Sequence, residues 1–208
     1  MKEERDYTRD LAEIRSMMVR STKFLSLSGW AGIMAGIYAL AGAWVAYAYL
    51  GFNPDQIIYS TQETGSLPSN LPKVIYLGIL ILLLALGTAI FLSYQKAAKR
   101  DENVWNAASR RLLLNMAVPL LAGGALILIF LSKDLIGLLA PMSLLFYGLA
   151  LYNAGNFTYY EIKYLGLTQI GLGLIGSWLI QYSLLLWAIG FGFVHIVYGI
   201  YMHFRYER

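Results

Sequence analysis

His195 is the residue whose type stands out most against its surroundings in this chain. It lies in the last apolar stretch, FGFVHIVYGIYMHFRYER, where its nearest neighbours are aliphatic, aromatic or glycine. An ionisable side chain inside a membrane is rare and commonly marks a ligand site, a proton path or a contact between helices. His195 is therefore the first candidate for chemistry.

Four further polar side chains are expected at a depth similar to that of His195. They are Gln169, Asn115, Tyr147 and Asn153. If these side chains converge, they form a cavity open to the cytoplasm in which His195 orients a small apolar or lipid-like ligand. Alternatively, each polar group hydrogen-bonds a neighbouring helix with no ligand present, a contact worth about 0.6 kcal/mol on average.

In the second interpretation His195 is neutral and faces the interior of the bundle. Its expected partners are Gln169, Asn115, Tyr147 or a backbone carbonyl freed on a neighbouring helix. Charging the ring in hydrocarbon is costly, and the apolar blocks contain no carboxylate to pair with it. Both interpretations stay open at the level of sequence.

Several kinds of chemistry are excluded by residue counts. The chain has no cysteine, which removes disulfides, thiolate metal sites and iron–sulfur clusters. The two histidines, His195 and His203, are eight residues apart on one expected helix, too far to share a metal ion. A nucleophile-plus-base motif and a buried carboxylate pair are also missing. We expect no catalytic site, no metal site and no cofactor, and we favour a protein that is not an enzyme.

The composition indicates the environment in which these residues must be positioned. Hydrophobic residues make up 58% of the 208 residues and charged residues 13%, with a mean hydropathy of +0.56. Soluble domains average roughly 45–50% apolar and about 25% charged residues. The first twenty residues alternate charged with apolar types, so we expect no cleavable signal peptide. The composition predicts a multi-pass membrane protein.

Six apolar blocks are each close to the length of about 20 residues that a helix needs to cross a bilayer. The predicted crossings are Leu25–Leu50, Lys73–Tyr94, Leu112–Leu131, Leu135–Ala154, Ile162–Ile180 and Leu184–His203. Only helices satisfy the backbone within such segments, so we predict an all-α bundle of six transmembrane helices. Very short connections at 132–134 and 181–183 predict that the helices they join are antiparallel neighbours.

Lysine and arginine set the expected orientation of the bundle. Of the 16 cations, 14 lie on the side that holds both ends of the chain, and only Lys73 and Lys133 lie on the other. Because cytoplasmic loops carry the excess of cations, both termini are predicted to be cytoplasmic, in a bacterial inner membrane. The net charge of +4 then reflects topology and not binding of nucleic acid. The role of the outer loop Phe52–Pro72 is left open.

Residues 1–24 form a separate cytoplasmic segment before the transmembrane domain of residues 25–208. Leu11, Ile14 and Met18 recur at helical spacing, with charged residues on the other faces. This pattern predicts an amphipathic helix, either lying on the inner leaflet or mediating self-association. We favour the interfacial position, because the apolar stripe is short and its cations suit anionic lipid.

Small residues predict where helices approach one another closely. Expected packing positions are Ser28, Gly32 and Gly36 in the first crossing, and Gly166, Gly173 and Gly176 in the fifth. Such residues support contacts within one subunit or a homo-oligomer. Pro119 and Pro141 are expected to interrupt the third and fourth crossings and to free the carbonyls of Asn115 and Gly137.

Several stretches resemble a known family: EIRSMM, LLFYGLALYNAG, YLGLTQIGLGLIG, LLWAIGFGFVHIVYG and RYER. Over nearly the whole chain the sequence is similar to a family of uncharacterised bacterial six-pass integral membrane proteins. The resemblance implies the six-helix fold and no established activity. Some of those proteins carry an automatic label of carotene-cleaving oxygenase, a chemistry that holds iron with several histidines, whereas this chain offers only His195 and His203.

Three classes of function remain. The first is a structural or regulatory membrane protein that works through partners or self-association. The second is a binder or carrier of a small apolar or lipid-like molecule. The third is a haem protein or enzyme that uses His195. A partner protein, a co-purifying lipid and a coloured preparation, respectively, would distinguish them.

Overall fold

The computed structural model describes residues 24–25, 27–54, 69–99 and 104–207, and every regular element in these ranges is a helix. The predicted amphipathic helix of residues 1–24 lies outside the described residues, apart from Phe24. Most of the Phe52–Pro72 loop lies outside them as well.

The described elements are all helical and are named by their order along the chain. They are α2 (Gly29–Ala48), α4 (Leu71–Ala98), α5 (Ala107–Ser132), the 3₁₀ turn η1 (Ile136–Leu138), α6 (Leu139–Ala154), α7 (Ile162–Trp178), the 3₁₀ turn η2 (Ile180–Tyr182), α8 (Ser183–Trp187), the π-helix η3 (Ala188–Val194) and α9 (His195–Tyr206).

Five helical stretches of the described chain are long and apolar enough to cross a membrane. They are α2, α4, α5, η1 with α6, and the run from Ile180 to Tyr206. Large apolar side chains on them face outward, for example Leu121, which is 73% exposed, and Val118, which is 72% exposed. Such surfaces suit lipid and would associate in water. The fold is therefore that of a multi-pass membrane protein.

The remaining long helix, α7, is at the lower limit for a crossing. Its 17 residues span about 26 Å at 1.5 Å per residue, against a hydrocarbon core of about 30 Å.

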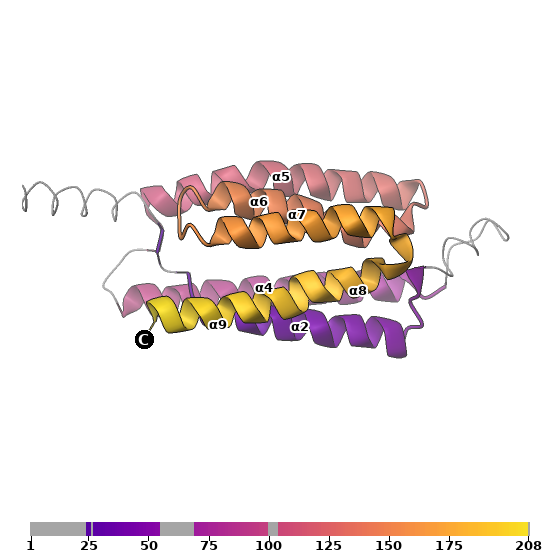
Figure 1. Cartoon of the computed structure of the whole chain (residues 1–208), viewed down its shortest axis with the longest axis horizontal. Helices are drawn as coiled ribbons and strands as arrows, with labels where there is room; N and C mark the ends of the chain where they lie inside the picture. Colours follow the sequence, from indigo (N-terminus) through magenta and orange to yellow (C-terminus); the bar gives the residue numbers. More distant parts are fainter. Residues whose placement is uncertain (1–23, 26, 55–68, 100–103, 208) are drawn as a thin grey trace, which may run out of the picture.

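The helices form two layers that run along the long axis of the molecule (Figure 1). One layer holds α5, α6 and α7, and the other holds α4, α2 and the α8–α9 arm. The helices α4 and α5 lie at the periphery, packed mainly on α2 and α6, respectively. The layers meet where α8 and η3 contact α6, α7 and α2.

Glycines bring the helix backbones together at two seams. At Gly36 of α2, a Cβ atom would lie 2.6 Å from the Gly192 carbonyl oxygen, and at Gly32 it would lie 3.3 Å from the Gly199 Cα atom of α9. At Gly166 of α7, a Cβ atom would lie 2.7 Å from the Gly148 carbonyl oxygen of α6. Close backbone approach of this kind is how helices associate in lipid.

Of the other predicted packing positions, two lie at the α6–α7 seam and one precedes α2. Gly173 and Gly176 face Pro141 of α6, and Ser28 is the residue that precedes α2.

Pro141 does not interrupt a helix, contrary to expectation. The helix α6 begins at Leu139 after η1, so Pro141 occupies its first turn, where the missing N–H costs no hydrogen bond. Pro119 does lie inside α5, where it is buried. The start of α5 is fixed by a reciprocal capping box between Asn106 and Ser109.

The last helix also departs from expectation, because it stays beside α7 only near the connecting turn. Beyond His195 it runs along α2, with which α9 makes its main contact (Figure 1). Gly29, Gly32 and Gly36 of α2 pack against Gly192 and Gly199. This close backbone packing holds the last helix on α2, although a short turn joins it to α7.

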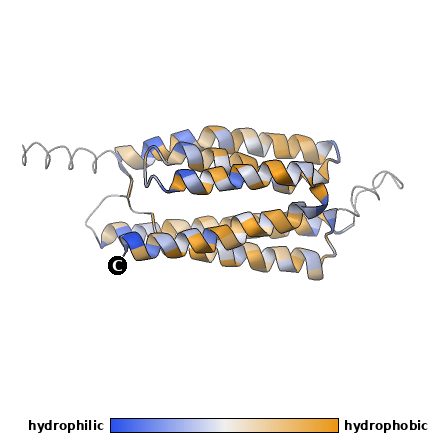
Figure 2. Cartoon of the chain, in the orientation of Figure 1, coloured by the Kyte–Doolittle hydropathy of each residue, from blue (hydrophilic) through white to orange (hydrophobic). Residues whose placement is uncertain are grey.

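The segment that precedes α2 is tied to the turn between α6 and α7. The Phe24 amide donates to the Phe157 carbonyl at 2.8 Å, Thr158 Oγ1 donates to the Phe24 carbonyl, and the Tyr159 hydroxyl donates to the Leu25 carbonyl at 2.8 Å. These bonds link the two layers at the end that carries the C-terminus. Figure 2 shows that hydrophilic residues gather at this end and at the opposite connections, with apolar residues between.

Candidate functional site

His195 is the first residue of α9 and lies at the contact between the two layers. Its side chain is 5% exposed. Ring atom Nδ1 is 2.8 Å from the Gly190 carbonyl oxygen, and Nε2 is 3.1 Å from the Tyr147 hydroxyl. A carbonyl oxygen can only accept, so Nδ1 carries the proton and Nε2 of the neutral ring accepts from Tyr147. Both ring nitrogens are thus engaged by protein atoms.

The acceptor at Gly190 depends on local backbone geometry. Residues 188–194 form a π-helix, a wider turn that is often found where a helix serves a function. The Gly190 carbonyl accepts from His195 Nδ1 and from Gln169 Nε2, each at 2.8 Å. A side chain at position 190 would not fit, because a Cβ atom would lie 2.5 Å from Leu144 and 2.6 Å from Gln169 Oε1.

Gln169 of α7 is fully buried, at 0% exposure. Its amide nitrogen lies 3.4 Å from His195 Nδ1, and since both atoms donate to the Gly190 carbonyl, they share an acceptor and do not bond each other. Its Oε1 atom has no hydrogen-bond partner among the described residues. We call Tyr147, Gln169, Gly190 and His195 the His195 cluster.

Aromatic rings cover the His195 cluster on one side. The Phe191 ring stacks on His195 with centroids 5.7 Å apart, and the Tyr147 ring lies 5.5 Å from His195. Trp187 continues the stack, with its ring 5.1 Å from that of Phe191. The cluster is therefore a polar contact enclosed by apolar surface, and it connects α6, α7 and the last helix.

Three of the five predicted site residues meet, and two do not. Asn115 is exposed on α5, where its side chain donates to the Arg111 carbonyl at 2.8 Å, so its expected contact with His195 was wrong. A local bond within its own helix satisfies that amide. Asn153 is exposed near the end of α6. The carbonyl that His195 uses belongs to its own helix and is presented by a π-helix, not freed by a proline.

A second polar cluster, which the sequence did not indicate, lies at the end of the bundle. Glu207 accepts hydrogen bonds from Lys96 Nζ at 2.9 Å, His203 Nδ1 at 2.8 Å and the Gly29 amide at 2.9 Å. Burial alone would raise the pKa of Glu207, but the bonds from His203, Lys96 and Gly29 outweigh it and lower the pKa to about 2. These contacts join α2, α4 and α9 at the N-terminus of α2, where the helix dipole also favours an anion.

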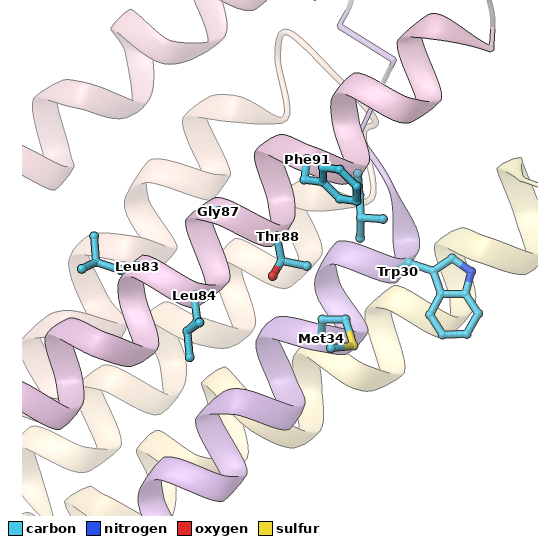
Figure 3. Close-up of a pocket in the computed structure, with 8 residues that line it drawn as sticks. Trp30, Met34, Leu83, Leu84, Gly87, Thr88 and Phe91 are labelled. Carbon is cyan, nitrogen blue, oxygen red and sulfur yellow. The ribbon is translucent and has the colours of Figure 1, made fainter.

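A groove between α2 and α4 is lined by no residue of the His195 cluster (Figure 3). It has a volume of about 600 Å³. Its lining is almost wholly apolar: Trp30, Met34, Leu83, Leu84, Gly87, Thr88, Phe91 and Leu92. None of the predicted site residues contributes to it.

No protein-family model, no curated protein sequence and no solved structure matches this chain. Within the described residues, no group of three or more His, Asp or Glu side chains is arranged to hold a metal ion.

Proposed function

We propose that this chain is a six-crossing protein of the bacterial inner membrane, with both termini cytoplasmic, that works by association and not by catalysis at His195. The bias of 14 of the 16 cations to one side supports the orientation. The resemblance to a family of six-pass membrane proteins favours the same number of crossings.

One observation carries the proposal that His195 is a joint between helices. Both of its nitrogens are bonded, to the Gly190 carbonyl and to the Tyr147 hydroxyl. A ligand or a haem iron held by Nε2 would have to displace Tyr147 from a ring that is 5% exposed. The cluster is better suited to fix the two layers against each other than to bind and release a molecule.

The peripheral helices support association as the mode of action. Their outward surfaces carry large exposed apolar side chains, such as Leu83 and Leu121, and α5 has a glycine with open space above it, Gly124. Small residues between large ones permit close approach of another helix or of lipid. Association with a partner protein or a second copy is the primary candidate, and lipid binding at the α2–α4 groove is the second.

The number of crossings can be tested by cysteine labelling, since the chain has no cysteine of its own. Lys133→Cys, Asn156→Cys and Gln181→Cys each introduce one thiol at an exposed turn. We expect a membrane-impermeant maleimide to label Lys133→Cys and Gln181→Cys on intact cells, and Asn156→Cys only after permeabilisation. Labelling of Asn156→Cys and Gln181→Cys from the same side would show that α7 does not cross.

Association can be tested by native mass spectrometry after detergent-free extraction into nanodiscs. We expect masses above the 23.3 kDa of one chain, from a partner protein or a second copy. His195→Leu is the informative variant, with Val197→Leu, at an exposed position of the same helix, as the control. A single chain that carries a small molecule, lost in His195→Leu and kept in Val197→Leu, would refute association and favour the ligand alternative.

A further inference from the structure

The groove between α2 and α4 has a closed end and an open end. Near the closed end the helices touch, because a Cβ atom at Gly42 would lie 2.0 Å from Ile81 Cδ1. The Tyr38 hydroxyl and Thr88 Oγ1, 3.2 Å apart, link the two walls. Toward the start of α2 the groove opens at Trp30, which is 50% exposed (Figure 3).

The length of the groove distinguishes between occupants. From Leu83 to Leu92, α4 rises by about 14 Å, close to half of the roughly 30 Å hydrocarbon core. A partner helix spans the whole core, so about half of its length would lie outside the groove. An acyl chain belongs to one leaflet and spans about half of the hydrocarbon core. The length of the groove therefore favours a lipid chain.

The open end carries the features of a membrane interface. Trp30 packs edge-on against His203 with ring centroids 5.5 Å apart, and tryptophan prefers the headgroup level. Thr88, Leu92 and Lys99 lie on one face of α4, because offsets of seven and eleven residues return to the same side of a helix. Lys99 stands about 10 Å beyond Leu92, near the depth of a phosphate.

Lys99 is suited to meet an anion. Its side chain is exposed, and no described carboxylate forms an ion pair with it. By contrast, the neighbouring Lys96 is engaged by Glu207. A lysine at a helix end extends its ammonium toward the headgroups while its stem covers apolar surface.

We propose that the α2–α4 groove binds one acyl chain of an anionic phospholipid from the leaflet at the C-terminal end of α4, with Lys99 at the phosphate. In the proposed topology this is the cytoplasmic leaflet, and the proposal rests on the membrane insertion argued above. Apolar contact with the groove supplies the binding, and the cation at its mouth selects a negative headgroup.

The test uses the full chain, purified and delipidated in detergent, with bound lipid counted by native mass spectrometry. The probes are phosphatidylglycerol and phosphatidylcholine with identical acyl chains. Gly87→Phe fills the groove from its wall, where nothing lies within 4 Å of the glycine. Gly78→Phe is the matched control, because Gly78 is also on α4, has equally open space and does not line the groove.

We expect the unmodified chain and Gly78→Phe to bind one phosphatidylglycerol more tightly than any further lipid. Gly87→Phe should weaken that first binding by about tenfold or more, since a few displaced methylenes account for such a loss. Lys99→Gln should remove the preference for phosphatidylglycerol over phosphatidylcholine while it leaves binding of either lipid measurable.

Equal binding by Gly87→Phe and Gly78→Phe would overturn the proposal, as would an unchanged headgroup preference in Lys99→Gln. A protein partner would also overturn it if Gly87→Phe abolished cross-linking from Met34→Cys to that protein while lipid binding stayed unchanged. Carbonate extraction distinguishes a failure of the proposed function from a failure of the lipid-binding proposal. A chain that is washed from membranes contradicts the proposed function, whereas a chain that stays embedded but shows no groove-specific lipid contradicts only this inference.

Discussion

Gly199 of α9 provides the sharpest test of how the helices are held together. A Cβ atom at this position would lie 2.5 Å from the Gly29 carbonyl oxygen and 2.7 Å from the Ile33 amide nitrogen, whereas ordinary contacts begin at 3.4 Å. Both obstructing atoms are backbone atoms of α2, which cannot rotate away. Gly199→Ala must therefore push α2 and α9 apart by about 1 Å, a shift that a close-packed interior resists.

The expected free-energy change combines two opposing effects. Overpacking costs about 1–3 kcal/mol, and replacing a helical glycine with alanine returns up to about 1 kcal/mol. We therefore expect Gly199→Ala to lower the free energy of unfolding by about 1–2 kcal/mol. A Cβ atom added at Gly78 would have nothing within 4 Å, so Gly78→Ala brings no overpacking. Only the gain from replacing a helical glycine remains, and the variant should be unchanged or slightly stabilised.

Both variants can be compared by reversible unfolding in mixed micelles with increasing SDS, followed by helicity. Gly148→Ala extends the test to the α6–α7 seam, where a Cβ atom would lie 2.7 Å from the Gly166 carbonyl oxygen. If Gly199→Ala proves as stable as Gly78→Ala, the seam is not close-packed and the reasoning fails.

Three further predictions concern the polar clusters and use the same unfolding assay. Tyr147→Phe removes the donor to His195 Nε2 and should lower the free energy of unfolding by about 0.6–1.7 kcal/mol, the range measured for such bonds in membranes. A loss of several kcal/mol would contradict the interpretation of this bond as an ordinary contact between helices. Gln169→Met should leave the free energy of unfolding nearly unchanged, because the Gly190 carbonyl still accepts from His195 Nδ1 and an unpaired buried oxygen is removed. A loss above about 3 kcal/mol would show that Gln169 Oε1 has a stabilising partner. Glu207→Gln should cost about 1–2 kcal/mol at pH 7 after screening by water is allowed for. Because the pKa of Glu207 is lowered from 4.5 to about 2 in the folded state, the unmodified chain has this extra stability above pH 4.5 and loses it as the pH falls to 2. If Glu207→Gln is still less stable than the unmodified chain at pH 2, the ion-pair explanation is refuted.

Much of the candidate site could be predicted from residue type and depth. Tyr147 and Gln169 were expected beside His195 because polar groups in hydrocarbon seek partners at the same level, and both are found there. Asn115 met the same criterion, yet it bonds its own helix at the Arg111 carbonyl. Depth alone does not say which face of a helix a residue occupies relative to helices elsewhere in the chain.

The parts of the site that involve backbone atoms could not be predicted in this way. Gly190 contributes a carbonyl, and every residue has one, so only the π-helix and the absence of a side chain make this one accessible. The Glu207 cluster was missed for a related reason. Its partners Lys96, His203 and Gly29 come from three helices that are far apart in the sequence.

The sequence by itself predicted the helical class and six apolar crossings, of which five are long apolar helices in the structure. This could be predicted because an apolar segment in lipid must satisfy its backbone hydrogen bonds within its own helix. It also marked Gly32, Gly36 and Gly166 as small residues, since that property is intrinsic to each position. Only the tertiary structure decided that α9 pairs with α2 and α6 with α7, that η3 widens into a π-helix, and that α2 and α4 leave a groove between them. These features depend on which surfaces fit at contact distance, and lipid, being as apolar as the side chains, supplies no pattern in the sequence from which that choice could be read.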